Sequence, residues 1–592
     1  MSIVEQARKR FEPRPYSTQS ASSNYSTNSR AGFSPQTSSA QSSISEKYSL
    51  ERSPRTWGMP IDTSYHEEDD DLHMPSPMRD RWSDRGPGIF TSRGLANLGC
   101  LLILALGLIG LFGGLPVYSI IRDVKQTRQG GFNYGGINGT GQIPQLIGNY
   151  GLIDRDTPLE ARTKFSYHTG EEMVLVFSDE FNEDGRTFYP GDDPYWEAVD
   201  LWYWGTVNLE WYDPSQVTTS GGSLRIHLDR VDDPSTNHNM SFKGGMLQSW
   251  NKFCFTGGLI EASVQLGGSP DVGGLWPAVW TMGNLGRAGY GATLEGLWPY
   301  SYDECDVGTT KNQTYPWDKT RPEQATVEGD GLYDDVLSYL PGQRLSACTC
   351  PGESHPGPMR SNGYFVGRAA PEIDVLEAIV EDGVAQISQS AQWAPFNAQY
   401  ATIDSENSII FHNTSTTTFN PFLGGAFQQT TSGLVTTNRD CYERSGPDAC
   451  YATYGFEYRP GFDDAYITWI SDARPTWTIL QQRLEADPRV DIGQRIVSRE
   501  PMYIIANLGL SPSFGDLDLE TIEVPATMSI DWIRVYQPAN AVNIGCDPKE
   551  FPTAKYIETY KEAYENANLT TWEEFGQPWP KSRMDNEAGT CD

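Results

Sequence analysis

Between about Glu171 and Gln537, apolar and polar residues alternate in short runs that turn residues separate. Runs such as "MVLVFSDEF", "GGLIEASVQL" and "MSIDWIRVYQ" are rich in β-branched and aromatic residues, and Gly, Asn, Asp or Pro bounds them. A period of two predicts β-strands, and many short strands in succession predict an all-β sandwich or barrel. A helical period is clearest from Phe551 to Asn566, where we expect one amphipathic helix.

One long interruption separates two of these predicted strands. The residues between Trp280 and Glu372 are rich in Gly, Pro, Asp and Cys and show no regular period. A structureless loop of this length is unusual inside a compact domain. We therefore expect a large insertion that Cys305, Cys348 and Cys350 staple through disulfides.

The first part of the chain follows a different pattern. Residues 1–94 are rich in Ser, Thr, Asn and Gln and predict a disordered cytosolic tail. Residues 95–121 contain no charge and exceed the ~20 residues that span a bilayer, which predicts one transmembrane signal-anchor helix. A Gly/Asn-rich lumenal stem follows at 122–164, then the β-domain at 165–540 and a C-terminal extension at 541–592.

The composition narrows the classes of partner. The net charge of −33 makes nucleic acid an unsuitable partner and fits an uncharged substrate. Aromatic residues make up 12% of the chain, including 17 Trp, and such residues either fill a core or stack on the flat faces of sugars.

The cysteines and glycosylation sequons point to an oxidising compartment. Cys100 lies in the predicted span, and the other eight cysteines follow it: Cys254, Cys305, Cys348, Cys350, Cys441, Cys450, Cys546 and Cys591. An even number on one side fits disulfides, whereas Cys348-Thr-Cys350 has the wrong spacing for a zinc knuckle, so we expect neither metal nor cofactor. We expect Cys546 and Cys591 to pair and pin the extension to the body; an interaction arm is the alternative.

Five acceptor sequons lie on the same side of the predicted span. They are Asn138, Asn239, Asn312, Asn413 and Asn568. We expect a single-pass type II membrane glycoprotein of the secretory pathway (endoplasmic reticulum or Golgi) or the plasma membrane, with a lumenal or extracellular body.

The stretch "PEIDVLEAIV" holds three carboxylates in a predicted strand. Glu372 and Asp374 share one face by alternation, but Glu377 has the wrong parity. A β-bulge near Val375 and Leu376 would return Glu377 to that face. Retaining glycosidases hold two carboxyls ~5–5.5 Å apart, and three close carboxylates cannot all ionise easily. The alternative is three exposed acids on an edge strand.

Glu372-Ile-Asp374-Val-Leu-Glu377 resembles the E-x-D-x-x-E signature of glycoside hydrolase family 16, the laminarinase-like β-glucanases. The segments "VFSDEFN", "GGLIEASVQL" and "GLWPAVW" resemble other strands of that family, in its order. "GGMLQSWNKFCFTGG" and "LSACTCPGESHPGP" resemble the fungal β-glucan synthesis-associated membrane glycoproteins. This resemblance implies a concanavalin-like jelly-roll sandwich and a role in making cell-wall β-1,6-glucan.

Residue roles also follow from the resemblance. It implies Glu372 as nucleophile, Glu377 as general acid/base and Asp374 as electrostatic helper. It further implies a glucan cleft lined by four residues: Asn208, Trp276, Trp280 and Trp393.

The sequence departs from family 16 at two places. Ser263 stands where an Arg is common, and Gln389, Ser390 and Gln392 follow the catalytic strand where a His is common. Two functions therefore remain open. One is a retaining glycosidase or transglycosylase acting on β-glucan; the other is a non-catalytic glucan-binding scaffold or assembly factor that works with cell-wall synthesis proteins.

Overall fold

The computed structural model describes residues 92–114, 151–325, 340–396, 408–446 and 448–591. The predicted tail up to residue 91 and most of the predicted stem lie outside these residues. From residue 163 onward the described chain is dominated by β-strands, and almost all of their pairings are antiparallel. The prediction of an all-β body is confirmed.

Most strands belong to two sheets, here called sheet A and sheet B. Sheet A contains, in spatial order, β13 (Ile409–Phe411), β19 (Arg474–Leu480), β18 (Tyr466–Ser471), β17 (Ala452–Arg459), β9 (Gly258–Gln265) and β21 (Ala526–Pro538). Two strands share the far edge of β21: β2 (Glu172–Asp179) and β7 (Leu224–Arg230). Beyond them, β1 (Thr163–Phe165) pairs with β2, and β6 (Val217–Thr219) pairs with β7.

Sheet B carries the strand with the three carboxylates at its centre. It contains, in order, β3 (Glu197–Ala198), β8 (Phe242–Gln248), β20 (Met502–Gly509), β10 (Trp276–Gly283), β11 (Glu372–Glu381), β12 (Val384–Trp393) and β16 (Gln428–Thr436). The outer edge of β16 pairs with β14 (Thr417–Phe419) and β15 (Gly424–Gly425), and β4 (Leu201–Trp202) and β5 (Glu210–Tyr212) form a small ribbon against β8.

The main core lies between the two sheets. Alternate residues of both sheets point into it, such as Ile260 and Val264 from β9 and Ile373 and Val375 from β11. Burial of apolar surface on this scale is the main stabilising term of the fold. The protein body is therefore a β-sandwich, and the other face of sheet B remains available for chemistry.

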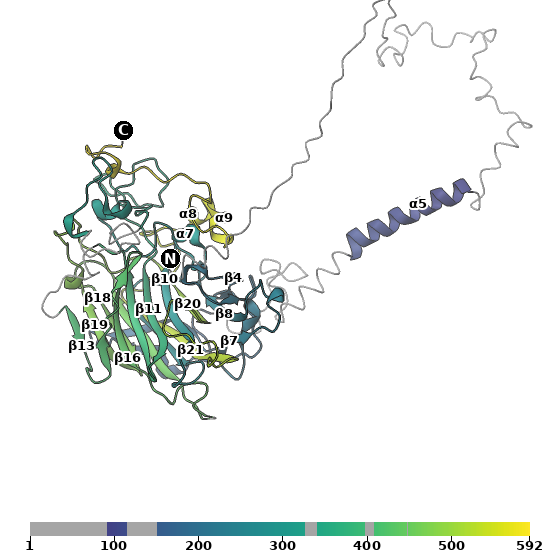
Figure 1. Cartoon of the computed structure of the whole chain (residues 1–592), viewed down its shortest axis with the longest axis horizontal. Helices are drawn as coiled ribbons and strands as arrows, with labels where there is room; N and C mark the ends of the chain where they lie inside the picture. Colours follow the sequence, from purple (N-terminus) through teal and green to yellow (C-terminus); the bar gives the residue numbers. More distant parts are fainter. Residues whose placement is uncertain (1–91, 115–150, 326–339, 397–407, 447, 592) are drawn as a thin grey trace, which may run out of the picture. The chain divides into compact units, whose positions relative to one another are not determined.

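A second apolar cluster covers part of that other face. Trp280, Met282 and Tyr503 of sheet B pack there against Leu297 of the insertion and Tyr564 of the extension. Three short α-helices belong to these covering segments: α7 (Gly291–Leu294), α8 (Ala554–Thr559) and α9 (Lys561–Glu565). They lie at one end of sheet B, beyond β10 and β11 (Figure 1).

Disulfides join all eight cysteines of the body, but one predicted pairing was wrong. The pairs are Cys254–Cys546, Cys305–Cys348, Cys350–Cys591 and Cys441–Cys450. Cys546 and Cys591 therefore do not pair with each other, because each lies against a cysteine of a different segment of the body. The extension is still pinned to the body, through two bridges in place of one.

The C-terminal helix also differs from the prediction. The single helix expected from Phe551 to Asn566 is divided into α8 and α9 at Tyr560. Tyr560 has φ −113° and ψ 30°, outside helical values, and its ring contacts Trp572 and Phe575. Packing of this ring accounts for the break.

The first described unit contains α5 (Ser92–Ile109), which continues as a π-helical turn from Gly110 to Gly114. Among the residues that the structure describes, no helix is long and apolar enough to cross a membrane. Residues 115–121 of the predicted span lie outside the described residues. The body itself begins earlier than expected, since Ile153 forms a β-bridge with Ser178.

Candidate active site

A β-bulge interrupts β11 between Asp374 and Glu377. Asp374 pairs with Ser390 and Glu377 with Ser388 on β12, so Val375 and Leu376 together oppose Gln389. On the other side, Asp374 pairs with Trp280 and Leu376 with Val279, which identifies Val375 as the extra residue. One extra residue resets the alternation of side chains. Glu377 therefore shares the outer face of sheet B with Glu372 and Asp374, as the sequence predicted.

The three carboxylates are close together and differ in burial. Asp374 is 1% exposed, whereas Glu372 and Glu377 are half-buried. The Ser390 hydroxyl reaches Asp374 and Glu377, at 2.7 Å from Asp374 Oδ2 and 3.4 Å from Glu377 Oε2. The two glutamates therefore keep only partial exposure, on either side of a buried aspartate.

Each carboxylate has a different set of hydrogen-bond donors. The Trp298 indole N–H donates to Glu372 Oε2 at 2.6 Å. Asp374 Oδ2 accepts from Ser390 and, at 3.1 Å, from Gln392 Nε2, whose amide oxygen is held by Thr430. Glu377 has the weakest support, because the buried Trp276 N–H lies near it without reaching hydrogen-bond geometry.

Burial and mutual repulsion raise the pKa of all three acids. Burial raises the pKa of Glu372 well above its usual value, and the charges of Asp374 and Glu377 add to the rise. Burial and Asp374 likewise raise the pKa of Glu377. The pKa of Asp374 rises to about 6 through burial, against the opposing hydrogen bonds from Ser390 and Gln392. The hydrogen-bond donors to the three acids described above are all neutral side chains. The site therefore favours keeping at least one of the three carboxyls protonated near neutral pH.

This arrangement can perform paired acid and nucleophile chemistry. Glu372 has a short N–H donor that stabilises its ionised form, which suits a nucleophile. Glu377 has long, weak donors and a negative neighbour, which suits a proton donor. The described residues contain no group of three His, Cys, Asp or Glu side chains placed to hold a metal ion.

Two of the predicted binding residues lie beside the carboxylates. Trp276 and Trp280 are on β10 and share the outer face of sheet B. Trp276 is half-buried and its ring stacks on Phe514, with ring centroids 4.3 Å apart. Trp280 is buried, and its N–H donates to Asn507 Oδ1 at 2.8 Å. The Trp276 N–H thus lies beside Glu377, whereas Trp280 supports the floor of the site.

The other two predicted binding residues are placed differently. Asn208 is buried, and its amide group bonds to Glu210, Tyr212 and Thr206, so no polar atom of its side chain is left for a ligand. Burial raises the pKa of its partner Glu210 to about 7. Trp393 follows Gln392 on β12 and lies in the core between the sheets, on the face opposite the carboxylates.

Sequence reasoning missed two residues near the carboxylates. Trp298 precedes its partner Glu372 by 74 residues in the chain and comes from the insertion. Tyr203 is half-buried, and the charges of Glu372, Asp374 and Glu377 help burial to raise its phenol pKa. Tyr203 lies in the aromatic stretch "LWYWGTVNLEW", and no spacing rule distinguishes it from its aromatic neighbours.

The residues noted as departures from family 16 have distinct places. Ser263 lies on β9 of sheet A, away from the sheet that carries the carboxylates. Ser390 and Gln392 lie next to Asp374 and bond to it. Ser263, in place of the common Arg, is therefore too far away to alter the three carboxylates directly. Ser390 and Gln392, which follow the carboxylate strand, do contact them.

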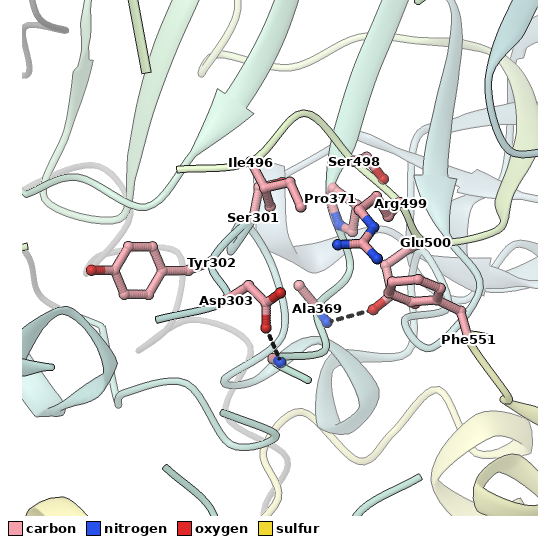
Figure 2. Close-up of a pocket in the computed structure, with 11 residues that line it drawn as sticks. Ser301, Tyr302, Asp303, Ala369, Pro371, Ile496, Ser498, Arg499, Glu500 and Phe551 are labelled. Atoms are coloured by element: carbon pink, nitrogen blue, oxygen red, sulfur yellow. Dashed lines mark hydrogen bonds between the residues drawn. The ribbon is translucent and has the colours of Figure 1, made fainter. Parts of the chain in front are cut away.

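A small cavity lies beside Pro371, directly before β11 (Figure 2). Its volume is about 20 Å³, which suits a single water molecule and not a sugar ring. Segments of the insertion, the loop before β20 and Phe551 of the extension meet there. The cavity is therefore a junction of the covering segments and not a glucan site.

Of the predicted glycosylation sites, four lie among the described residues. Asn239, Asn413 and Asn568 are exposed and Asn312 is half-buried. Asn138 lies outside the described residues.

Comparisons with known proteins match most of this chain to one protein family. Residues 59–588 match the family model for "Beta-glucan synthesis-associated protein SKN1/KRE6/Sbg1". The chain is 42% identical over 545 residues to the β-glucan synthesis-associated protein KRE6 of Saccharomyces cerevisiae, which covers 90% of this chain and 70% of that protein. It is 39% identical over 531 residues to SKN1 of Candida albicans, which covers 89% of this chain and 67% of that protein.

Solved structures were also compared. The catalytic domain of an endo-1,3-β-glucanase (laminarinase) from Thermotoga petrophila aligns with a TM-score of 0.36 and 18% identity, covering 62% of this chain and 100% of that domain. An endo-β-1,3-glucanase from Pyrococcus furiosus aligns with a TM-score of 0.36 and 17% identity, covering 64% of this chain and 98% of that structure.

Proposed function

Because the chain belongs to the SKN1/KRE6/Sbg1 family of β-glucan synthesis-associated proteins, we propose that it acts on cell-wall β-glucan as a retaining glycosidase or transglycosylase. We assign β-1,6-glucan assembly as the process it serves and a jelly-roll of the family 16 type as its scaffold. The observation that carries the proposal is the bulge at Val375, which places Glu372, Asp374 and Glu377 on one face of sheet B.

In this mechanism, Glu372 attacks the anomeric carbon while Glu377 donates a proton to the departing glycosidic oxygen. The product is a covalent glycosyl-enzyme and a released sugar hydroxyl. Glu377 then takes a proton from the incoming nucleophile, which frees the sugar from Glu372 with its original configuration. A sugar hydroxyl can replace water at this step, so the same site serves transfer as well as hydrolysis.

The charges of the three acids support Glu372 as the nucleophile and Glu377 as the proton donor. Asp374 carries two donors and lies between the glutamates, where its negative charge keeps a proton on Glu377. It also repels Glu372, which the Trp298 N–H offsets. The three groups together hold one proton donor and one nucleophile at neutral pH.

Glu372→Gln tests this proposal. The substitution removes the nucleophile with little change in shape, so turnover of β-glucan oligosaccharides should fall by at least about 100-fold. The matched control is Glu381→Gln at the end of the same strand, which should leave turnover unchanged. Product analysis of the purified protein with a glucan acceptor, together with wall β-1,6-glucan measured in cells, provides the readout. Normal wall glucan at normal protein level in the Glu372→Gln cells would refute catalysis.

A second function, a non-catalytic glucan-binding scaffold, is favoured by one observation. The insertion covers the Glu372 end of the site, where Trp298 already occupies one carboxylate oxygen. In that case the wild-type protein would bind glucan oligosaccharides and never turn them over, with or without an acceptor.

We also propose that the protein is a single-pass type II membrane glycoprotein, with its body in the secretory pathway or outside the cell. Four disulfides within the described body support an oxidising compartment. The uncharged run at residues 95–121 supports an anchor. Protease protection of the body in sealed microsomes, together with a mobility shift on glycosidase treatment, tests both parts.

A further inference from the structure

We infer that Trp298 is a positioning residue for the Glu372 carboxylate, and that the C-terminal extension, residues 541–592, holds Trp298 in place. The inference rests on the proposed function where it concerns turnover. Its structural basis is the 2.6 Å bond from the Trp298 indole N–H to Glu372 Oε2. A short bond of this kind to a carboxylate fixes one oxygen and stabilises the ionised form.

The backbone around Trp298 is tied on both sides. Ala370 N–H donates to Leu297 O at 3.0 Å, which links the residue before Trp298 to the segment that enters β11. Arg344 N–H donates to Gly296 O at 2.8 Å. Leu297 is fully buried in the second apolar cluster. The indole therefore meets Glu372 from a rigid segment.

Gly296 shows how closely the extension covers that segment. Its φ is +74°, and a Cβ added there would lie 2.7 Å from the Trp579 ring and 2.8 Å from Arg344 Cβ. Trp579 of the extension thus rests directly on the backbone two residues before Trp298. Only glycine fits this close approach and this backbone conformation.

Further contacts join the extension to α7 and to Glu295, which lies between α7 and Gly296. Ala292 N–H donates to Leu569 O at 3.0 Å, and Trp572 N–H donates to Glu295 Oε2 at 2.5 Å. The buried Arg344 guanidinium lies over the Trp572 ring, 3.6 Å from its centroid. These contacts hold the segment that carries Trp298 against the extension.

The start of the extension reaches the other flank of Glu372. Arg368 is fully buried, donates to Pro552 O at 2.8 Å and forms a two-bond ion pair with Glu500. Glu500 in turn accepts the Ala369 N–H, as Figure 2 shows beside Phe551 and Pro371. The extension therefore supports both the residues just before Glu372 and the tryptophan that binds its carboxylate.

Two disulfides fasten the extension at its ends, Cys254–Cys546 near its start and Cys350–Cys591 at its finish. The segment is too well anchored to be a freely moving arm. Its physical role is to keep the Trp298 donor at bonding distance from Glu372.

Trp298→Phe tests the first half of the inference in the full chain. Phe keeps the ring volume and removes the N–H donor. The pKa of Glu372 should then rise by about one to two units, since a hydrogen bond to a charged group contributes that much. Two readouts follow the shift: the acidic limb of the pH–turnover profile, and the titration of the Glu372 carboxyl carbon in ¹³C-glutamate-labelled protein, a signal that Glu372→Gln removes.

Trp579→Ala tests the second half. Trp579 is 38% exposed, so its loss should not unfold the body, yet it uncovers Gly296. It should move the acidic limb in the same direction as Trp298→Phe, by a smaller amount. The matched control is Trp317→Ala, a tryptophan 36% exposed that packs on Tyr315 in the insertion, which should leave the limb in place.

The outcomes separate this inference from the proposed function. A carboxyl-carbon titration that shifts in Trp298→Phe, when the wild-type protein shows no turnover, supports the positioning role and refutes catalysis. Turnover with an unchanged acidic limb and an unchanged titration in Trp298→Phe overturns the positioning role. A shift in Trp298→Phe with none in Trp579→Ala overturns the part assigned to the extension, as does an equal shift in Trp317→Ala.

Discussion

At the scale of single residues, the donors around each carboxylate distinguish three acids of similar chemistry. Glu372 receives one short indole bond and Asp374 two bonds from β12, whereas Glu377 has a hydroxyl contact of 3.4 Å and the nearby Trp276 N–H. Because desolvation raises the pKa of all three, these donors decide which acid loses its proton first. The division between nucleophile and proton donor therefore depends on contacts and not on residue type.

Asp374→Asn should stabilise the fold at neutral pH while it impairs turnover. The folded-state pKa of Asp374 is about 6, above its ordinary 3.8, so ionising it opposes folding. This cost is present above pH 6 and absent below about pH 4, where the carboxyl is protonated in both the folded and the unfolded state. The variant should gain on the order of 3 kcal/mol in free energy of unfolding at pH 7, and the gain should fade between pH 6 and pH 4. Urea unfolding of both proteins across this range gives the comparison, and an equal difference at pH 4 and pH 7 would contradict the assignment.

At the scale of elements, the bulge in β11 is the feature that makes the site. In a regular strand Glu377 would point into the core between the sheets, among Ile373 and Val375. An uncompensated carboxylate there would be strongly destabilising. The extra residue thus serves both packing and chemistry.

Deletion of Val375 tests the role of alternation directly. The shortened stretch, Glu-Ile-Asp-Leu-Glu, keeps its three acids on one face of a regular strand without any bulge. We expect a folded protein that retains measurable turnover, reduced much less than in Glu372→Gln. Circular dichroism and oligosaccharide product analysis check the two statements. A folded deletion variant as inactive as Glu372→Gln would show that the bulge supplies more than parity.

At the scale of the whole molecule, segments outside the sandwich complete the site. The insertion supplies Trp298, and the extension supports it through contacts at α7 and at Arg368. Disulfides that close long stretches of chain hold these segments to the body. The two sheets therefore supply the three carboxylates, but not the Trp298 donor or the segments that hold it.

Removal of individual disulfides should have unequal effects on stability. Cys254–Cys546 spans 292 residues and Cys441–Cys450 spans 9, so chain entropy predicts losses of roughly 6 and roughly 3 kcal/mol. Thermal unfolding of the paired Cys→Ser variants should show the larger fall in Tm for Cys254→Ser/Cys546→Ser. The opposite order would show that local packing, and not loop closure, controls the contribution of these bridges.

The sequence by itself determined the local features of this protein. Alternation of apolar residues predicted the strands, and the parity of Glu372, Asp374 and Glu377 predicted the bulge, because both depend on the backbone period within a few residues. Alternation over four residues likewise puts Trp276 and Trp280 on one face of their strand.

Only the tertiary structure decided the contacts between distant segments. It placed Trp393 in the core, bound the amide of Asn208 within the protein, paired Cys546 with Cys254 and brought Trp298 to Glu372. No local period encodes these outcomes, because they depend on which distant segments pack together. The carboxylates can therefore be read from the chain, whereas the donors that assign their roles come from the folded molecule.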